Sequence, residues 1–230
     1  MCIRDRISTV IADDRVAGVS LTGSERAGAI IAQQAGQALK KVVLELGGSD
    51  PFVVLSHDDI PALARDAAAI RFENTGQACN SNKRMIVMAD VYDEFVAEMV
   101  NPPGELQPID PLENTEGGGF SPLSSEAAAN GLLSQLEDAT ANGARLLVGG
   151  ERLDRDGFWV SPAVLVDVTP AARAYREELF GPVAMIFRVE SEAEALALAN
   201  DTPYGLGASV YSTDAAQAER FGEQLEAGMV

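Results

Sequence analysis

Short runs of apolar residues alternate along the chain with longer stretches in which apolar positions recur every three or four residues. The short runs, rich in Val, Ile and Leu, are typical of buried strands, whereas the longer period is that of a helix with one buried face. We predict strands at 16–21, 42–46, 52–55, 84–88, 146–148, 163–166, 184–189 and 206–211, and helices at 27–41, 62–72, 92–99, 124–142, from 191 onward and at 214–225. The alternation predicts an α/β fold whose sheet is covered by helices on both faces.

The segment 101–121 interrupts this alternation. It contains Pro102, Pro103 and Gly104, two further prolines, and three consecutive glycines at 117–119. Proline pairs and triple glycine do not sustain a helix, so we expect no helix here. A flexible insertion and a local sequence error both remain open as explanations.

One cysteine lies at a predicted corner between a helix and a strand. Cys79 has the polar neighbours Asn74, Gln77 and Asn80, and such a corner can project a thiol into a cleft. A lone cysteine is more often a small buried hydrophobe, and that interpretation stays open for this segment alone. The only histidine, His57, lies at a predicted helix start, where we expect a capping or solvent-facing role and not a Cys–His dyad.

A carboxylate interrupts the apolar run at 42–46. We predict that Glu45 lies within a buried strand that ends at Gly47 and Gly48. An unpaired buried carboxylate is costly and tends to have a raised pKa, so it rarely occurs without a role. The alternative is an edge strand with Glu45 facing water. Together with Cys79, Glu45 suggests a nucleophile and a base.

A small polar turn joins the first predicted strand to the first predicted helix. Thr22, Gly23 and Ser24 form this turn, and such a corner offers backbone N–H groups to an anion such as a pyrophosphate. An ordinary serine-capped helix is the alternative interpretation.

Four segments together resemble the signatures of the NAD(P)-dependent aldehyde dehydrogenase family, in the family's order. They are 19–24 (VSLTGS), 44–49 (LELGGS), 74–79 (NTGQAC) and 178–182 (ELFGP), and the resemblance covers about residues 10–230. The segments 21–28, 39–41 and 47–52 are most similar to the succinate-semialdehyde dehydrogenase branch.

Members of that family are considerably longer, so the resemblance implies that this chain is a fragment. Residues 1–46 are then the C-terminal remnant of a Rossmann-like dinucleotide-binding domain. Residues 47–230 are then the catalytic domain, truncated at its C-terminal end. Residues 1–6 have no expected counterpart in the family, and we expect them to be foreign sequence.

The resemblance also implies roles for individual residues. Cys79 attacks the aldehyde carbon and carries the acyl group as a thioester, its own N–H helps to stabilise the oxyanion, and Glu45 activates the water that releases the acid. Glu178 hydrogen-bonds the nicotinamide ribose, although Glu177 and Glu178 alone would be read as a solvated pair. The residues implied to lie beside NAD or NADP are Thr22, Gly23, Ser24, Leu46, Glu178 and Phe180.

Composition excludes several other classes of function. The net charge of −18 repels phosphate backbones and anionic membrane surfaces, so nucleic acid and membranes are not expected partners. Two cysteines without paired spacing and a single histidine argue against a disulfide framework or a metal site and fit a reducing cytoplasm. No apolar run approaches the ~18 residues of a membrane span.

The substrate and the activity of the segment by itself are less tightly constrained. A semialdehyde with a carboxylate, such as succinate semialdehyde, calls for an arginine fork, for which Arg71, Lys83 and Arg84 are candidates. The expected partners are a small aldehyde and, for the intact protein, further copies in a homodimer or homotetramer. The alternatives are a thiol hydrolase or acyltransferase that uses Cys79 without a dinucleotide, and a non-catalytic truncated chain. Even as a dehydrogenase, the segment alone is expected to be inactive.

Overall fold

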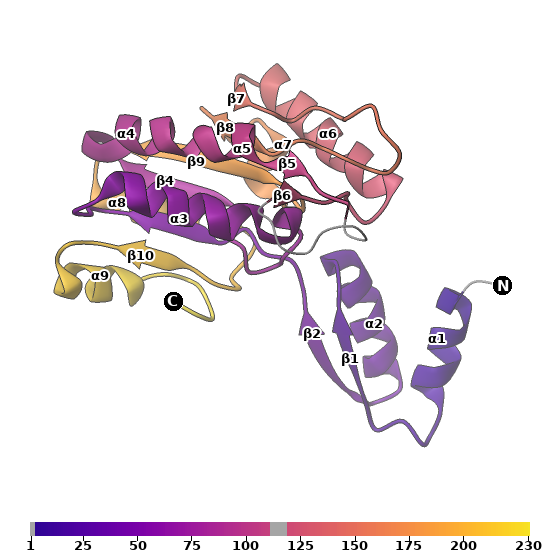
Figure 1. The fold of residues 1–230 in the computed structure, drawn as a ribbon. Coiled ribbons are helices and arrows are strands. Elements are labelled where there is room, and N and C mark those ends of the chain that lie inside the picture. The colour runs from indigo at the N-terminus through magenta and orange to yellow at the C-terminus, as the bar shows by residue number, and fades with distance from the viewer. Residues whose placement is uncertain (1–2, 111–118) are drawn as a thin grey trace. The chain divides into compact units, whose positions relative to one another are not determined.

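The computed structural model describes residues 3–110 and 119–230, and the chain divides into two compact units, residues 1–47 and 48–230. The smaller unit consists of α1 (Ile3–Ala12), β1 (Gly18–Thr22), α2 (Glu25–Gln37) and β2 (Lys41–Glu45) (Figure 1). Its two strands pair in parallel, with Val19 opposite Val42. Helix α1 was not predicted from the sequence.

The smaller unit has a thin core. Ile11 of α1 and Ala35 of α2 are buried, and Gly28 lies so close to Leu46 that a Cβ at this position would overlap the leucine side chain. Val43, in contrast, is 58% exposed. The prediction that residues 42–46 form a buried strand is therefore wrong, because each strand of a two-stranded sheet is an edge strand and helices cover only part of it.

The larger unit is built on a six-stranded sheet in the order β10-β3-β4-β9-β8-β7. Its strands are β3 (Pro51–Val54), β4 (Arg84–Met88), β7 (Arg145–Val148), β8 (Ala163–Val166), β9 (Val183–Val189) and β10 (Ser209–Tyr211). All neighbours run parallel except β7, which is antiparallel to β8. Strands β3 and β8 are buried throughout, as expected where helices cover both faces of a sheet.

Alternate residues of each strand enter different cores because successive side chains point to opposite faces. On one face, α3 (Ile60–Phe72) and α4 (Ala89–Met99) pack against residues such as Phe52, Met85 and Ala184 (Figure 1). The opposite face is covered by α6 (Glu126–Ala141), α7 (Arg173–Arg176), α8 (Glu192–Asn200) and α9 (Ala215–Gly222). The predicted α/β fold with a doubly covered sheet is confirmed.

The proline- and glycine-rich segment differs from its prediction. Residues Asn101–Glu105 form a short helix, α5, in which the prolines occupy the first turn. Proline is tolerated there because the first N–H groups of a helix have no partner within it. Beyond it, β5 (Gln107–Pro108) pairs with β6 (Gly119–Phe120), while residues 111–118 of the predicted interruption lie outside the described residues.

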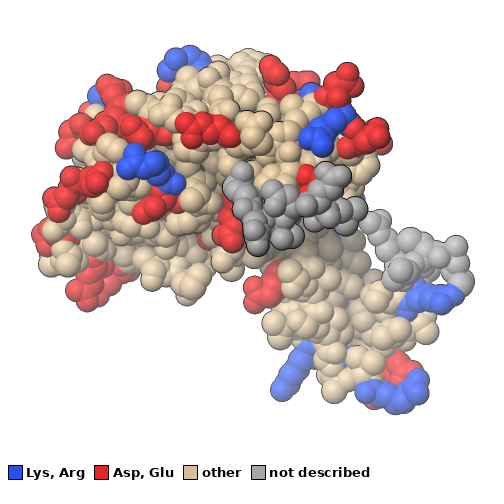
Figure 2. Space-filling view, in the orientation of Figure 1, with Lys and Arg blue, Asp and Glu red and all other residues tan. Residues whose placement is uncertain are grey.

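The surface of the larger unit reflects the acidic composition. Figure 2 shows acidic side chains spread over it, with lysine and arginine side chains in smaller groups between them. In the described part of the chain, no helix is both long and apolar enough to cross a membrane.

Candidate functional site

A left-handed turn leads from α3 to the cysteine. After Phe72 the chain forms the 3-10 helix Glu73–Gly76, in which Asn74, Thr75 and Gly76 have φ values of 48°, 57° and 67°. A Cβ at Gly76 would overlap the carbonyl of Gly181. Three consecutive residues in this sparsely populated region show that surrounding contacts hold the backbone in place.

Cys79 lies in the loop between this turn and β4, as the sequence predicted. It is a free cysteine and is half-buried, so it is not a fully buried hydrophobe. The preceding turn is fixed by the segment after β6: Ser121 N donates to Thr75 Oγ1 at 2.8 Å, and Ser124 N donates to Gln77 Oε1 at 2.9 Å. Residues far away in the sequence therefore hold the thiol's loop.

Lys83 lies beneath that loop, with a side chain that has no exposed surface. Its Nζ donates to the carbonyl oxygens of Ala78 and Cys79, both at 2.9 Å, and of Ser81 at 3.2 Å. Burial lowers the pKa of Lys83, the charge of Arg71 lowers it further, and a carboxylate, that of Glu178, raises it. The ammonium is thus a fixed cross-link inside the cysteine loop.

Glu178 connects this loop to two other segments. Its Oε1 lies 3.2 Å from Lys83 Nζ and accepts a hydrogen bond of 3.2 Å from Gly48 N, and its side chain remains 15% exposed. A Cβ at Gly48 would overlap the carbonyl of Cys79. Three of the four sequence motifs, represented by Gly48, Cys79 and Glu178, therefore meet within the larger unit.

Two buried arginines bind main-chain oxygens around this centre. Arg71 donates to the carbonyls of Val183, Leu179, Gly181 and Gly76 and to Ser81 Oγ. Arg84 donates to the carbonyls of Ser49, Leu198 and Ala199. Burial lowers the pKa of Arg71 to about 9 and that of Arg84 to about 10, so both stay protonated at neutral pH.

These contacts correct one prediction from the sequence. Arg71, Lys83 and Arg84 were candidates for binding a substrate carboxylate, but all three are buried and their donors are directed to the protein's own oxygen atoms. They stabilise the loops of the site and are not available to a substrate.

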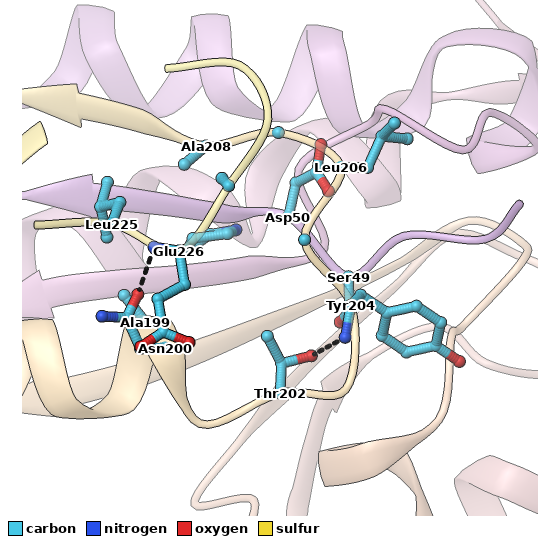
Figure 3. Close-up of a pocket in the computed structure, with 14 residues that line it drawn as sticks. Ser49, Asp50, Ala199, Asn200, Thr202, Tyr204, Leu206, Ala208, Leu225 and Glu226 are labelled. Carbon is cyan, nitrogen blue, oxygen red and sulfur yellow. Dashed lines mark hydrogen bonds between the residues drawn. The ribbon is translucent and has the colours of Figure 1, made fainter. Parts of the chain in front are cut away.

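Asp50 lies beside a small cavity of about 10 Å³, enough for roughly one water molecule (Figure 3). Its side chain is 3% exposed, and among the described residues its Oδ1 has no hydrogen-bond partner. Burial raises the pKa of Asp50 to about 6, although the backbone N–H of Gly207 and the charges of Lys83 and Arg84 lower it. Asp50 is therefore a buried acid that titrates near neutral pH.

In the smaller unit, the predicted strand–turn–helix corner is present. Thr22, Gly23 and Ser24 are exposed, Gly23 N donates to the carbonyl of Glu45 at 2.9 Å, and Ser24 caps α2 by accepting from Ala27 N. Beside this corner is a hollow of about 380 Å³ whose lining includes Ile7, Leu21, Ser24, Arg26 and Ile30.

The remaining predicted residues lie as follows. Glu45 is the last residue of β2 and is exposed within its unit, which corrects the prediction that it is buried inside a strand. Leu46 is half-buried and Phe180 is 42% exposed. His57 contacts the backbone of Asp59, which itself caps α3, so the histidine does not pair with Cys79. Cys79 and Glu45 belong to different units.

The structural roles of Lys83, Arg71 and Asp50 could not be inferred from the sequence. A charged residue is normally exposed, so a charge in the sequence does not suggest burial. The partners of Arg71 and Asp50 include backbone atoms of residues more than a hundred positions away in the sequence. The only available signal was position: Lys83 directly precedes a buried strand and Asp50 stands beside another.

The sequence profile of the aldehyde dehydrogenase family matches residues 4–230. Succinate-semialdehyde dehydrogenase (NADP(+)) of Deinococcus radiodurans is 52% identical over 224 residues, which are 97% of this chain and 46% of that protein. Succinate semialdehyde dehydrogenase (NAD(P)+) Sad of Escherichia coli is 44% identical, over 98% of this chain and 48% of that protein. The chain spans about half the length of the curated relatives it matches.

Among solved structures, succinic semialdehyde dehydrogenase from Streptococcus pyogenes in complex with NADP+ as the cofactor matches with a TM-score of 0.93 and 41% identity. The match covers 99% of this chain and 50% of that one. The resemblance inferred from the four motifs is confirmed. The family profile match begins at residue 4, and the expectation that residues 1–6 are foreign sequence stays a prediction.

Proposed function

Because this chain belongs to the aldehyde dehydrogenase family, we propose that it is part of an enzyme that oxidises an aldehyde to a carboxylic acid with NAD or NADP. Residues 1–46 are then part of the dinucleotide-binding domain, and residues 47–230 carry the thiol nucleophile. The observation that carries the proposal is the convergence of Gly48, Cys79 and Glu178 around the Lys83 ammonium.

In this proposal Cys79 is the nucleophile. Its sulfur attacks the aldehyde carbon, which becomes tetrahedral, and the developing oxyanion needs a donor. Within the described part of the chain, the backbone N–H of Cys79 donates to no other backbone group, which suits it to that task. Loss of hydride from the same carbon leaves a thioester on Cys79.

Glu45 is the proposed general base. It would remove a proton from the water that attacks the thioester, which releases the acid and restores the thiol. Glu45 precedes Gly48 by three positions in the chain, and Gly48 is the first residue of the unit that contains Cys79. The exposure of Glu45 in its own unit agrees with access to water.

The residues of the smaller unit fit the nucleotide part of NAD or NADP. The exposed corner formed by Thr22, Gly23 and Ser24 presents the N-terminus of α2, which suits a pyrophosphate. The neighbouring hollow is apolar at Ile7 and Ile30 and is large enough for a flat aromatic ring system. Its edge also includes Arg26, a charge suited to a phosphate.

The remaining implied contacts are at the nicotinamide end. Glu178 would bind the ribose through its exposed edge, while Leu46 and Phe180 would pack nearby. When bound, the nicotinamide accepts hydride. Within the larger unit, Lys83 and Gly48 hold the loop of the Cys79 thiol and the carboxylate of Glu178 in position.

Succinate semialdehyde is the proposed substrate, supported by the names of the Deinococcus and Escherichia relatives. Because Arg71, Lys83 and Arg84 are occupied, the group that binds its carboxylate is to be sought outside these three residues. We further propose a homo-oligomer in the cytoplasm, whose reducing conditions keep a free thiol such as that of Cys79 from oxidation to a disulfide.

The test uses the intact protein with succinate semialdehyde and either NAD or NADP, followed by the absorbance of the reduced cofactor. Cys79→Ser should abolish both the activity and labelling of this site by iodoacetamide, whereas Cys2→Ser should affect neither. Glu45→Gln should keep a burst of reduced cofactor while steady turnover falls ~10²–10⁴-fold. Cofactor-independent ester hydrolysis without any aldehyde oxidation would instead favour a thiol hydrolase.

A further inference from the structure

The Lys83 ammonium contacts more acceptors than it has hydrogen atoms. Four oxygens lie within 3.2 Å of Nζ: the carbonyls of Ala78, Cys79 and Ser81, and Oε1 of Glu178. An ammonium has three N–H groups and a neutral amine only two, and all four partners are acceptors. The surroundings therefore require the charged form, and they leave no donor for a ligand.

These partners belong to two functional parts of the site. Three of them are main-chain oxygens of the loop that presents Cys79, including the carbonyl of Cys79 itself. The fourth is the carboxylate of Glu178, which lies on a segment 95 residues further along the chain. One buried side chain thus fixes the distance between the cysteine loop and the glutamate segment.

We propose that Lys83 is a positioning residue that holds the Cys79 loop and Glu178 at a fixed separation. The thiol and the nicotinamide ribose bound by Glu178 then stay at one distance and orientation from each other. The inference rests on the proposed function, since it assigns Lys83 a task in that reaction. Gly48 supports the same arrangement, because it donates to the same oxygen of Glu178.

A mainly structural role and a positioning role predict different kinetics. If Lys83 only stabilised the fold, a folded variant would bind cofactor and react normally. If it positions both groups, its loss loosens Glu178, which weakens cofactor binding, and separately loosens the cysteine loop, which slows chemistry even at saturating cofactor.

The experiment compares Lys83→Met and Lys83→Arg in the intact protein, with Lys41→Met as a matched control at an exposed position. Calorimetry gives the dissociation constant for NAD and NADP, and rapid mixing gives the burst rate of reduced cofactor at saturation. In Lys83→Met we expect about tenfold to hundredfold weaker cofactor binding, from the loss of a charge-assisted contact to Glu178. We also expect a burst about a hundredfold slower, from misplacement of the thiol.

A double-mutant cycle with Glu178→Gln separates the two effects. Cofactor binding by Lys83→Met/Glu178→Gln should be no weaker than by Glu178→Gln alone, because Lys83 acts on the cofactor through that carboxylate. The burst of the double variant should still be slower than that of Glu178→Gln, because the cysteine loop is loosened independently.

Lys83→Arg keeps the charge and guards against a variant that fails to fold. Its planar guanidinium cannot reproduce the compact ammonium, so both quantities should change in the same direction. If either folded variant, checked by circular dichroism, matches the unchanged protein in dissociation constant and burst rate, the proposal is wrong. Absence of aldehyde oxidation in the unchanged protein would overturn the proposed function instead, and the calorimetric cycle would still test the Lys83–Glu178 link.

Discussion

Replacement of Asp50 by asparagine should change how the stability of the protein depends on pH. Burial raises the pKa of Asp50 from 3.8 to about 6 in the folded protein. Between these two values the folded state binds a proton that the unfolded state has already released. Stability contributed by this group is therefore greatest at low pH and falls as pH rises from about 4 to about 6.

The size of the effect follows from the two pKa values. One pKa unit corresponds to about 1.4 kcal/mol, so the full penalty for ionising Asp50 is about 3 kcal/mol above pH 6. Near its pI of about 4.3 the protein has little net charge and tends to precipitate, so measurements belong above pH 5. At pH 5 part of the free-energy penalty for ionising Asp50 already applies. Between pH 5 and 7.5 the expected change is about 1.4 kcal/mol.

Asparagine has nearly the shape of aspartate but does not ionise. The free energy of unfolding of Asp50→Asn minus that of the unchanged protein should thus rise by about 1.4 kcal/mol from pH 5 to 7.5, whatever constant offset the amide introduces. Urea denaturation followed by circular dichroism measures this difference, and Asp154→Asn, at an exposed position, is the control. A difference that stays flat within about 0.5 kcal/mol, or that falls with pH, would refute the reasoning.

Three further substitutions test the contacts that shape the site, each by urea denaturation. Arg71→Met should destabilise by about 3–5 kcal/mol because it leaves buried carbonyls without donors, whereas exposed Arg65→Met should cost less than about 1 kcal/mol. Gly76→Ala should cost more than about 1 kcal/mol, since its φ is positive and its Cβ meets a carbonyl, while Gly36→Ala, with open space around it, should be neutral or stabilising. Ser125→Ala should lower the free energy of unfolding by about 1 kcal/mol, because it removes the N-terminal cap of α6. An unchanged urea midpoint would contradict this capping role of Ser125.

The elements of the larger unit were predictable because their cores are repetitive. The apolar run at 163–166 corresponds directly to β8, and the helix predicted from residue 191 onward corresponds to α8, where Ser191 Oγ accepts from Glu194 N. Local pattern is sufficient when both faces of a strand are covered and a helix begins with its own capping residue.

The errors arose where local pattern and surroundings disagree. The run around Val43 has the composition of a buried strand, yet burial requires neighbours that the two-stranded sheet does not supply. Pro102 and Pro103 were read as helix breakers, although at the start of a helix they are tolerated.

The candidate site was predictable only as a set of motifs. Thr75 in a left-handed conformation could not be expected, because a β-branched residue avoids that region unless tertiary contacts impose it. Lys83 and Glu178 are 95 residues apart in the sequence, and no periodic pattern links positions at that distance. Such contacts are set by topology, which local pattern does not report.

The buried arginines donate mainly to main-chain oxygens, and this determines which substitutions would disturb their hydrogen bonds. Arg71 and Arg84 depend on where the carbonyls of residues such as Leu179, Val183 and Leu198 lie, and not on which side chains those residues carry. Substitutions at these acceptor positions are tolerated as long as the new side chain packs and the backbone stays in place. Because Leu179 and Val183 are themselves buried, a substitution there acts through packing, and the hydrogen bonds of Arg71 persist as long as the backbone does not move.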